Sequence, residues 1–162
     1  MKKSIAIYLG IFLSLAASRF IPHPPNFTSL IALSLYVPIL FGPRYILSVI
    51  LAFIVTDIFI GLHSTILFTW GSILFIGYFS KYFSLNIVSR TRGVLAGVLF
   101  FFIFTNFGVW LTGAYGYSLN GIVVCYTLAL PFLGYTFVST VLYAALIEAV
   151  SKIYNLHKIK SI

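Results

Sequence analysis

Six apolar segments follow one another along this chain of 162 residues, with only short polar stretches between them. Each is close to the roughly 20 residues that an α-helix needs to cross the hydrocarbon core of a bilayer. Hydrophobic residues make up 61% of the chain and charged residues 7%, a balance typical of a polytopic membrane protein. We therefore expect an all-α integral membrane protein, a six-helix transmembrane bundle that forms one domain over residues 1–162. The expected spans are approximately residues 4–19, 28–42, 45–62, 64–83, 93–112 and 131–150.

Two segments depart from a simple span. The second is short and contains Pro38, so we expect it to tilt, kink or end partway through the membrane. Residues 113–130 are apolar but are interrupted by Gly113, Gly116 and Gly121. These glycines predict a loop followed by a short interfacial or re-entrant helix before the last span.

The basic residues indicate the orientation. With six spans, nine of the ten Lys and Arg residues fall on one side of the membrane, which predicts that this side is cytoplasmic. Both termini are then cytoplasmic, and the expected location is the bacterial inner membrane. The net charge of +8 is thus explained by topology, and no nucleic-acid partner is expected. The nine residues are Lys2, Lys3, Arg44, Lys81, Arg90, Arg92, Lys152, Lys158 and Lys160.

The first segment allows a second interpretation. Lys2 and Lys3, an apolar stretch and the small residues Ala16, Ala17 and Ser18 resemble a signal peptide with its cleavage site. Cleavage would leave five spans and an external N-terminus, so the six-span interpretation is preferred.

Arg19 and Asp57 are the most informative charges. The chain has only two carboxylates, and Asp57 lies inside the apolar run 45–62. A charge at that depth is costly and usually faces protein or a water-filled cavity. Arg19 is the one basic residue on the opposite side from the others. Asp57 is therefore predicted either to orient a ligand or to form a structural ion pair with Arg19.

Polar and aromatic residues converge on the outer half of the predicted bundle. Asn106 and Trp110 lie four residues apart and share a helix face. A mostly apolar pocket with a few polar groups is the usual form of a ligand site. The aromatic residues also fit a belt at the membrane interface, and Arg19 fits a place among lipid headgroups. The candidate ligand-binding residues are Arg19, His23, Asn26, Asp57, Trp70, Asn106, Trp110 and Tyr126.

The first external loop contains Pro22, Pro24 and Pro25, which stiffen it and prevent a helix. Such a loop suits a lid over a pocket or a tight connector. On the first span, Ala6, Gly10, Ser14 and Ser18 form a stripe of small residues that lets another helix approach closely. That helix belongs either to a partner subunit or to the same chain.

No enzyme chemistry is predicted. The sequence has no phosphate-binding loop, paired carboxylates or nucleophile–base pair at helical spacing, and no cofactor is expected. His23, His63, Asp57 and the only cysteine, Cys125, match no metal-ligand spacing, so no metal site is expected. Cys125 is interpreted as a small buried hydrophobic residue. Glu148 and Lys152 are spaced for an ion pair along one helix.

Several motifs resemble, in order, one family of small, uncharacterised bacterial membrane proteins across about residues 15–147. They are Arg19-Phe20 with residues 22–27, Thr56-Asp57 with Gly61, residues 105–110, Cys125-Tyr126 and Pro131-Phe132. That family in turn is similar to the substrate-binding S components of energy-coupling factor (ECF) transporters. The onward similarity rests on the small size, the six spans, the long first external loop and the acidic residue with a following glycine.

The resemblance implies a membrane subunit that captures a vitamin or related micronutrient in an outward-facing pocket. It also implies docking onto a transmembrane coupling subunit with two ATPases through Gly10, Ser14, Ala17 and Ser18. These residues depart from the alanines typical of S components. Two alternatives stay open: a membrane scaffold of S-component-like fold, and a solitary secondary or metal-ion transporter.

Overall fold

The computed structural model describes residues 2–154, without the side chains of Lys2 and Lys3, and every regular element in that range is a helix. The expected all-α chain with six α-helices is confirmed. They are α1 (Lys2–Phe20), α2 (Leu30–Phe41), α3 (Ile46–Ile60), α4 (Ile66–Phe79), α5 (Ile87–Leu111) and α6 (Leu119–Ile153). The short 3-10 helices η1 (Pro43–Tyr45) and η2 (Ser80–Phe83) lead into α3 and follow α4.

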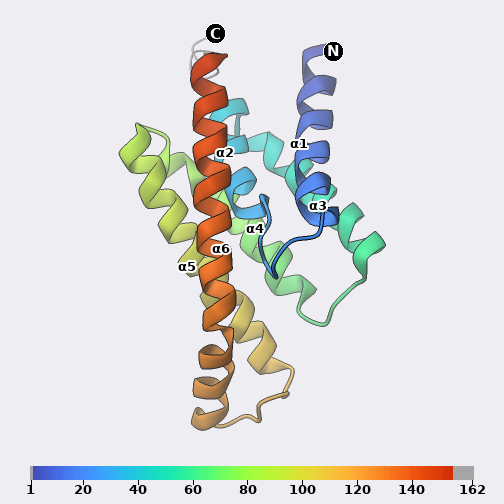
Figure 1. The fold of residues 1–162 in the computed structure, drawn as a ribbon, viewed down its shortest axis with the longest axis vertical. Helices are drawn as coiled ribbons and strands as arrows, with labels where there is room; N and C mark the ends of the chain where they lie inside the picture. The colour runs from blue at the N-terminus through green and yellow to red at the C-terminus, as the bar shows by residue number, and fades with distance from the viewer. Residues whose placement is uncertain (1, 155–162) are drawn as a thin grey trace.

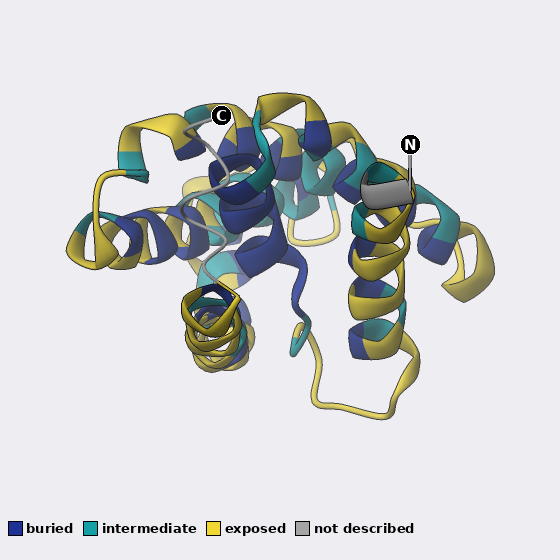
Figure 2. Cartoon of the chain, turned by 90° about the horizontal axis from the view of Figure 1, so that it is seen from above, coloured by how far each residue is buried: buried dark blue, intermediate teal, exposed yellow. Residues whose placement is uncertain are grey.

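Four of the described helical segments are long and apolar enough to cross a membrane: Pro43–Ile60, Ile66–Phe83, Ile87–Leu111 and Leu119–Ile153. Two shorter apolar helices, Ser4–Phe20 and Leu30–Phe41, accompany them. Large apolar side chains cover the outside of the bundle, and buried residues gather at its centre (Figure 2). Such an exterior suits lipid and not water, which is the arrangement of a membrane protein.

The short second helix, α2, is the centre of the bundle. All of its residues from Leu30 to Leu40 are buried, so it contacts protein on every side (Figure 2). Its 12 residues rise only about 18 Å, less than the hydrocarbon thickness. The helix continues through Pro38 and ends at Gly42, whose φ of 106° is accessible to glycine.

α5 begins earlier than expected. The sequence places the start of this span at residue 93, whereas the helix starts at Ile87. Asn86 caps it, because its side-chain oxygen accepts a hydrogen bond from the Ser89 backbone N–H at 2.9 Å. The polar stretch before residue 93 therefore forms the first turns of the helix.

The prediction of a separate short helix before the last span is wrong. Residues 119–153 form one α-helix of 35 residues, which rises about 52 Å. Gly113 and Gly116 have positive φ and belong to the preceding connection, whereas Gly121 lies in the first turn of α6. Pro131 stays inside the helix, as membrane helices tolerate when neighbouring groups satisfy the freed carbonyl.

The helices alternate in direction. α1 begins and α6 ends at the same end of the bundle, here called the near end (Figure 1). The connections 21–29, 61–65 and 112–118 lie toward the opposite, far end. α5 and α6 run side by side, and their far halves extend beyond the other helices, while α1 stands apart from α6 and packs along α3 (Figure 1).

The basic residues of the described chain follow this alternation. Arg44 lies in η1, Lys81 in η2, Arg90 and Arg92 in the first turns of α5, and Lys152 in the last turn of α6, all toward the near end. Arg19 ends α1 on the opposite side. Lys158 and Lys160 lie outside the described residues.

Candidate functional site

An ion pair joins the far ends of α1 and α3. Arg19 Nη2 lies 2.6 Å from Asp57 Oδ1, and the Asp57 residue is 0% exposed. The ion pair predicted as one of the two roles of Asp57 is present. Its carboxylate faces protein and not lipid.

The guanidinium of Arg19 has further partners on α3. Its Nη1 donates to Thr56 Oγ1 at 2.5 Å and to the Phe53 carbonyl at 3.3 Å. Its Cζ lies 4.5 Å from the centroid of the Phe53 ring, a cation–π contact. Arg19 is therefore fixed in orientation by a carbonyl, a hydroxyl, a carboxylate and an aromatic face.

Trp70 completes this polar cluster from α4. Its indole N–H donates to Asp57 Oδ2 at 2.8 Å, so one carboxylate oxygen is held by charge and the other by a hydrogen bond. The cluster of Arg19, Asp57 and Trp70 thus ties α1, α3 and α4 together inside an apolar bundle. The sequence predicts Trp70 as a flat apolar wall of a ligand pocket. In the structure its indole N–H bonds the Asp57 carboxylate.

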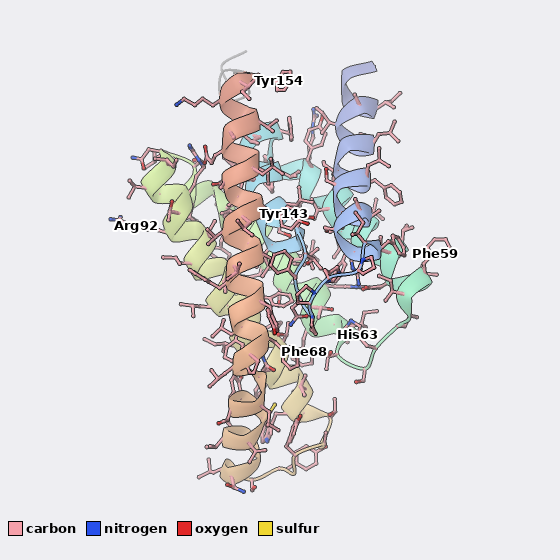
Figure 3. The ribbon with its side chains drawn as sticks, in the orientation of Figure 1. Phe59, His63, Phe68, Arg92, Tyr143 and Tyr154 are labelled. Atoms are coloured by element: carbon pink, nitrogen blue, oxygen red, sulfur yellow. The ribbon has the colours of Figure 1, made fainter. Side chains whose placement is uncertain are left out.

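Two adjoining cavities open toward the far half of the bundle. The first has a volume of about 400 Å³ and lies among α4, α5 and α6. The second, of about 310 Å³, lies beside it against α1, α3 and the 21–29 connection. They share five lining residues: Asn26, His63, Thr69, Phe101 and Thr136. We call them the first and second cavity; His63 stands on the connection between α3 and α4 that borders both (Figure 3).

Four of the eight sequence-predicted ligand residues line these cavities. Arg19 and His23 line the second cavity, Asn106 lines the first, and Asn26 lines both. Asn106 donates its amide N–H to the Phe102 carbonyl at 2.7 Å, which leaves its side-chain oxygen available.

The other predicted residues point elsewhere. Asp57 lies behind Arg19, fully buried. Trp110 donates its indole N–H to the Gly116 carbonyl at 3.0 Å, and Tyr126 donates its hydroxyl to the Ile103 carbonyl at 2.7 Å. Asp57, Asn106 and Trp110 therefore do not line one cavity as predicted, because Asp57 is buried behind Arg19 and Trp110 packs on the 112–118 connection.

Threonines are the lining residues that sequence reasoning missed. Thr69 and Thr136 line both cavities, Thr105 lines the first and Thr140 the second. Each hydroxyl donates to a carbonyl of its own helix at 2.6–2.9 Å. The signal was hydroxyl residues at helical spacing inside apolar spans, such as Thr136 and Thr140, which is weak because such residues often pack structurally.

The connection 21–29 borders both cavities. Asn26 has φ of 61°, a left-handed conformation, and its carbonyl lies 3.5 Å from the Ser139 hydroxyl of α6. His23 Nδ1 lies 2.7 Å from the Pro24 carbonyl. The connection thus reaches across from α1 to α6 and forms part of the cavity wall.

The small residues of α1 divide into two groups. Ser18 is buried, and its hydroxyl lies 2.8 Å from that of Ser29, so it holds α1 to the start of α2. Gly10, Ser14 and Ala17 are exposed. Gly10 and Ser14 border an open apolar groove of about 840 Å³ between α1 and α6, whose floor is α2.

A second, partly buried ion pair lies at the near end. Arg90 Nη2 donates to Glu148 Oε2 at 3.1 Å, Arg90 Nε contacts Glu148 Oε1, and the Tyr36 hydroxyl donates to the same Oε1 at 2.9 Å. The spacing in the sequence predicts an ion pair of Glu148 with Lys152 along one helix. In the structure, Glu148 of α6 pairs with Arg90 of α5 and accepts a hydrogen bond from Tyr36 of the central helix α2, so the three helices meet at this carboxylate.

Within residues 2–154, no three His, Cys, Asp or Glu side chains come together. Cys125 is buried against the first cavity, with Sγ 3.5 Å from the Asn106 carbonyl. This agrees with its interpretation as a small buried residue.

The described residues form an all-helical fold with four helices long and apolar enough to cross a membrane, and a buried ion pair lies beside two adjoining cavities. The model of a family of unknown function (DUF6580) matches residues 1–162, and the chain belongs to that family. A search of curated proteins and a search of solved structures each found no match.

Proposed function

We propose that this protein is a membrane-embedded substrate-binding subunit for the uptake of a small nutrient, a vitamin or related micronutrient. The observation that carries the proposal is the pair of joined cavities, with volumes of about 400 and 310 Å³. Their size suits a small organic molecule, and their mixture of apolar walls and a few polar groups is that of a ligand site.

In this proposal the far end faces the outside of the bacterial inner membrane, and both termini are cytoplasmic. The orientation is supported by the basic residues near η1, η2 and the start of α5. Ligand enters between the 21–29 and 61–65 connections and is held by Asn26, Asn106 and the cavity threonines.

The proposed partner is a transmembrane coupling subunit of the ECF type with its ATPases. It is supported by the groove between α1 and α6, where Gly10 and Ser14 leave room for the close approach of a helix. The groove also contains Ser151, whose buried hydroxyl has no partner within residues 2–154.

Mass spectrometry of small molecules released from the purified protein tests the proposal. The wild type is expected to release one compound that Thr136→Phe does not, because residue 136 lines both cavities and the bulky ring would take up space where the ligand lies. Thr127→Phe is the matched control, since Thr127 is exposed on the same helix. Equal release from all three folded proteins, or release of bilayer lipid alone, would contradict the proposal.

A further inference from the structure

Arg19 supplies the only permanently charged side chain among the described residues that line the two cavities, and His23 and His63 line them as well. Arg19 is the only Lys or Arg among their lining residues within the described chain, and neither Asp nor Glu lines them. The chain has two carboxylates in total. Asp57 is paired with Arg19 and Trp70, and Glu148 is paired with Arg90 and Tyr36 at the near end. No carboxylate is therefore available to neutralise a cationic ligand.

The second cavity presents hydrogen-bond donors. A guanidinium has five N–H donors, and Arg19 uses two of them in hydrogen bonds to Phe53 and Thr56, while its Nη2 forms the ion pair with Asp57. Asp57 is fully buried and absent from the lining, so the guanidinium lies between the carboxylate and the cavity. The positive end of the ion pair is the end that a ligand meets.

The first cavity presents acceptors. The hydroxyl protons of Thr69, Thr105 and Thr136 are donated to the carbonyls of their own helices, at 2.7–2.9 Å. A hydroxyl that has donated its one proton offers only lone pairs to other groups. The Asn106 amide donates its N–H to the Phe102 carbonyl, and its side-chain oxygen is a further acceptor. Phe101, Phe102 and Phe132 supply flat apolar contact around these oxygens.

From this polarity we propose the chemical class of the ligand, an inference that rests on the proposed function. It is a flat or partly apolar small molecule with a carboxylate, or another acceptor oxygen, at the Arg19 end. At the other end it has N–H or O–H donors that meet the threonine and asparagine oxygens. A cationic molecule is disfavoured, because the guanidinium of the ion pair, and not the Asp57 carboxylate, faces the cavity in a site of low dielectric.

Charged thiol reagents test this polarity directly and require no identified ligand. Thr69 lines both cavities, so Thr69→Cys in a Cys125→Ala background places a single thiol there. The probes are anionic sulfonatoethyl and cationic trimethylammonioethyl methanethiosulfonate. In each reaction the thiolate attacks the sulfenyl sulfur, a mixed disulfide forms and methanesulfinate leaves. Ala114→Cys, on the exposed 112–118 connection, is the matched control in the same background.

We expect the anionic-to-cationic rate ratio at Thr69→Cys to exceed that at Ala114→Cys by about tenfold, the lower end of what focused charge produces in clefts. An equal or lower ratio would overturn the ligand class and leave the proposed capture of a small molecule intact. If neither reagent reaches Thr69→Cys while both modify Ala114→Cys, the cavities are closed and both proposals fail.

A neutral version of the ion pair separates the charge effect from the shape of the cavity. Arg19→Gln combined with Asp57→Asn removes both charges and leaves a neutral, polar amide at each position. In the Thr69→Cys background, this double variant is expected to lower the rate ratio to that of Ala114→Cys. A ratio that stays high would show that Arg19 is not the source of the preference and would overturn its role as the acceptor anchor.

Discussion

At the scale of single residues, the site depends on the carboxylate of Asp57. It lies in an apolar bundle and has contacts from three helices: its own, α1 through Arg19 and α4 through Trp70. Burial of charge is tolerated only with such partners. Its burial behind Arg19 makes it a positioning residue, which holds the guanidinium toward the second cavity.

Asp57→Asn should therefore destabilise the protein strongly. The change leaves Arg19 buried without its counter-charge, which costs about 3–5 kcal/mol in comparable buried pairs. Thermal unfolding of the purified protein in detergent measures the loss. The double variant Arg19→Gln/Asp57→Asn should recover most of it, because no unpaired charge remains. A single variant as stable as the wild type would show that water reaches the pair.

At the scale of helices, the far half of α6 depends on one close contact. A Cβ on Gly121 would collide with the backbone carbonyl oxygens of Tyr115 and Gly116, which cannot move without opening the 112–118 connection. Ser118 also caps α6 at this point, accepting from the Gly121 N–H at 3.1 Å. The glycine therefore fixes how the connection folds onto the helix.

Gly121→Ala is expected to destabilise the protein by about 1–3 kcal/mol, the usual cost of overpacking. Gly134→Ala is the matched control on the same helix, since nothing lies within 4 Å of its added methyl group. It should be neutral or stabilising by up to about 1 kcal/mol, because alanine favours helix over glycine. Measured side by side, Gly121→Ala should unfold at a lower temperature than Gly134→Ala. The reverse order would show that a methyl group at residue 121 meets open space.

The helices show which parts of the structure were accessible from the sequence. Apolar runs of about 20 residues predicted six helices well, because lipid requires every backbone group to be satisfied within the helix. Helix starts at Asn86 and Ser118 depend on single capping bonds that the hydropathy pattern does not contain. The glycines near residue 113 predicted a break, yet only those at positive φ produced one.

The site was predictable in part for a related reason. The Arg19–Asp57 pair followed from the scarcity of acids, because a buried carboxylate with one available cation has few choices. The aromatic residues were misplaced because the depth of a residue in a span does not fix the direction in which its side chain points. Trp110 lies at the expected end of α5, but its indole N–H bonds the Gly116 carbonyl of the 112–118 connection. Threonines were missed because hydroxyl residues at helical spacing are a weak signal: their hydroxyls commonly bond within their own helices, as those of Thr105 and Thr136 do here.

At the scale of the whole molecule, the proposed orientation predicts which ends are accessible. Arg44, Lys81 and Lys152 lie toward the near end, which should therefore face the cytoplasm. A tag after Ile162 should be protected from an added protease in intact cells, whereas a tag inserted at Ala114 should be cleaved. Cleavage of the C-terminal tag in sealed cells would reverse the orientation and turn the cavities inward.

The central claim is that the joined cavities hold a small molecule between Arg19 and the threonines of α4, α5 and α6. A crystal structure of the wild type, purified without added ligand and grown in a lipid mesophase, tests it most directly. We predict compact non-protein density in contact with Asn26, Thr69 and Thr136, three of the five residues that line both cavities. Cavities closed by protein side chains, or filled only by acyl chains continuous with the surrounding bilayer, would contradict it.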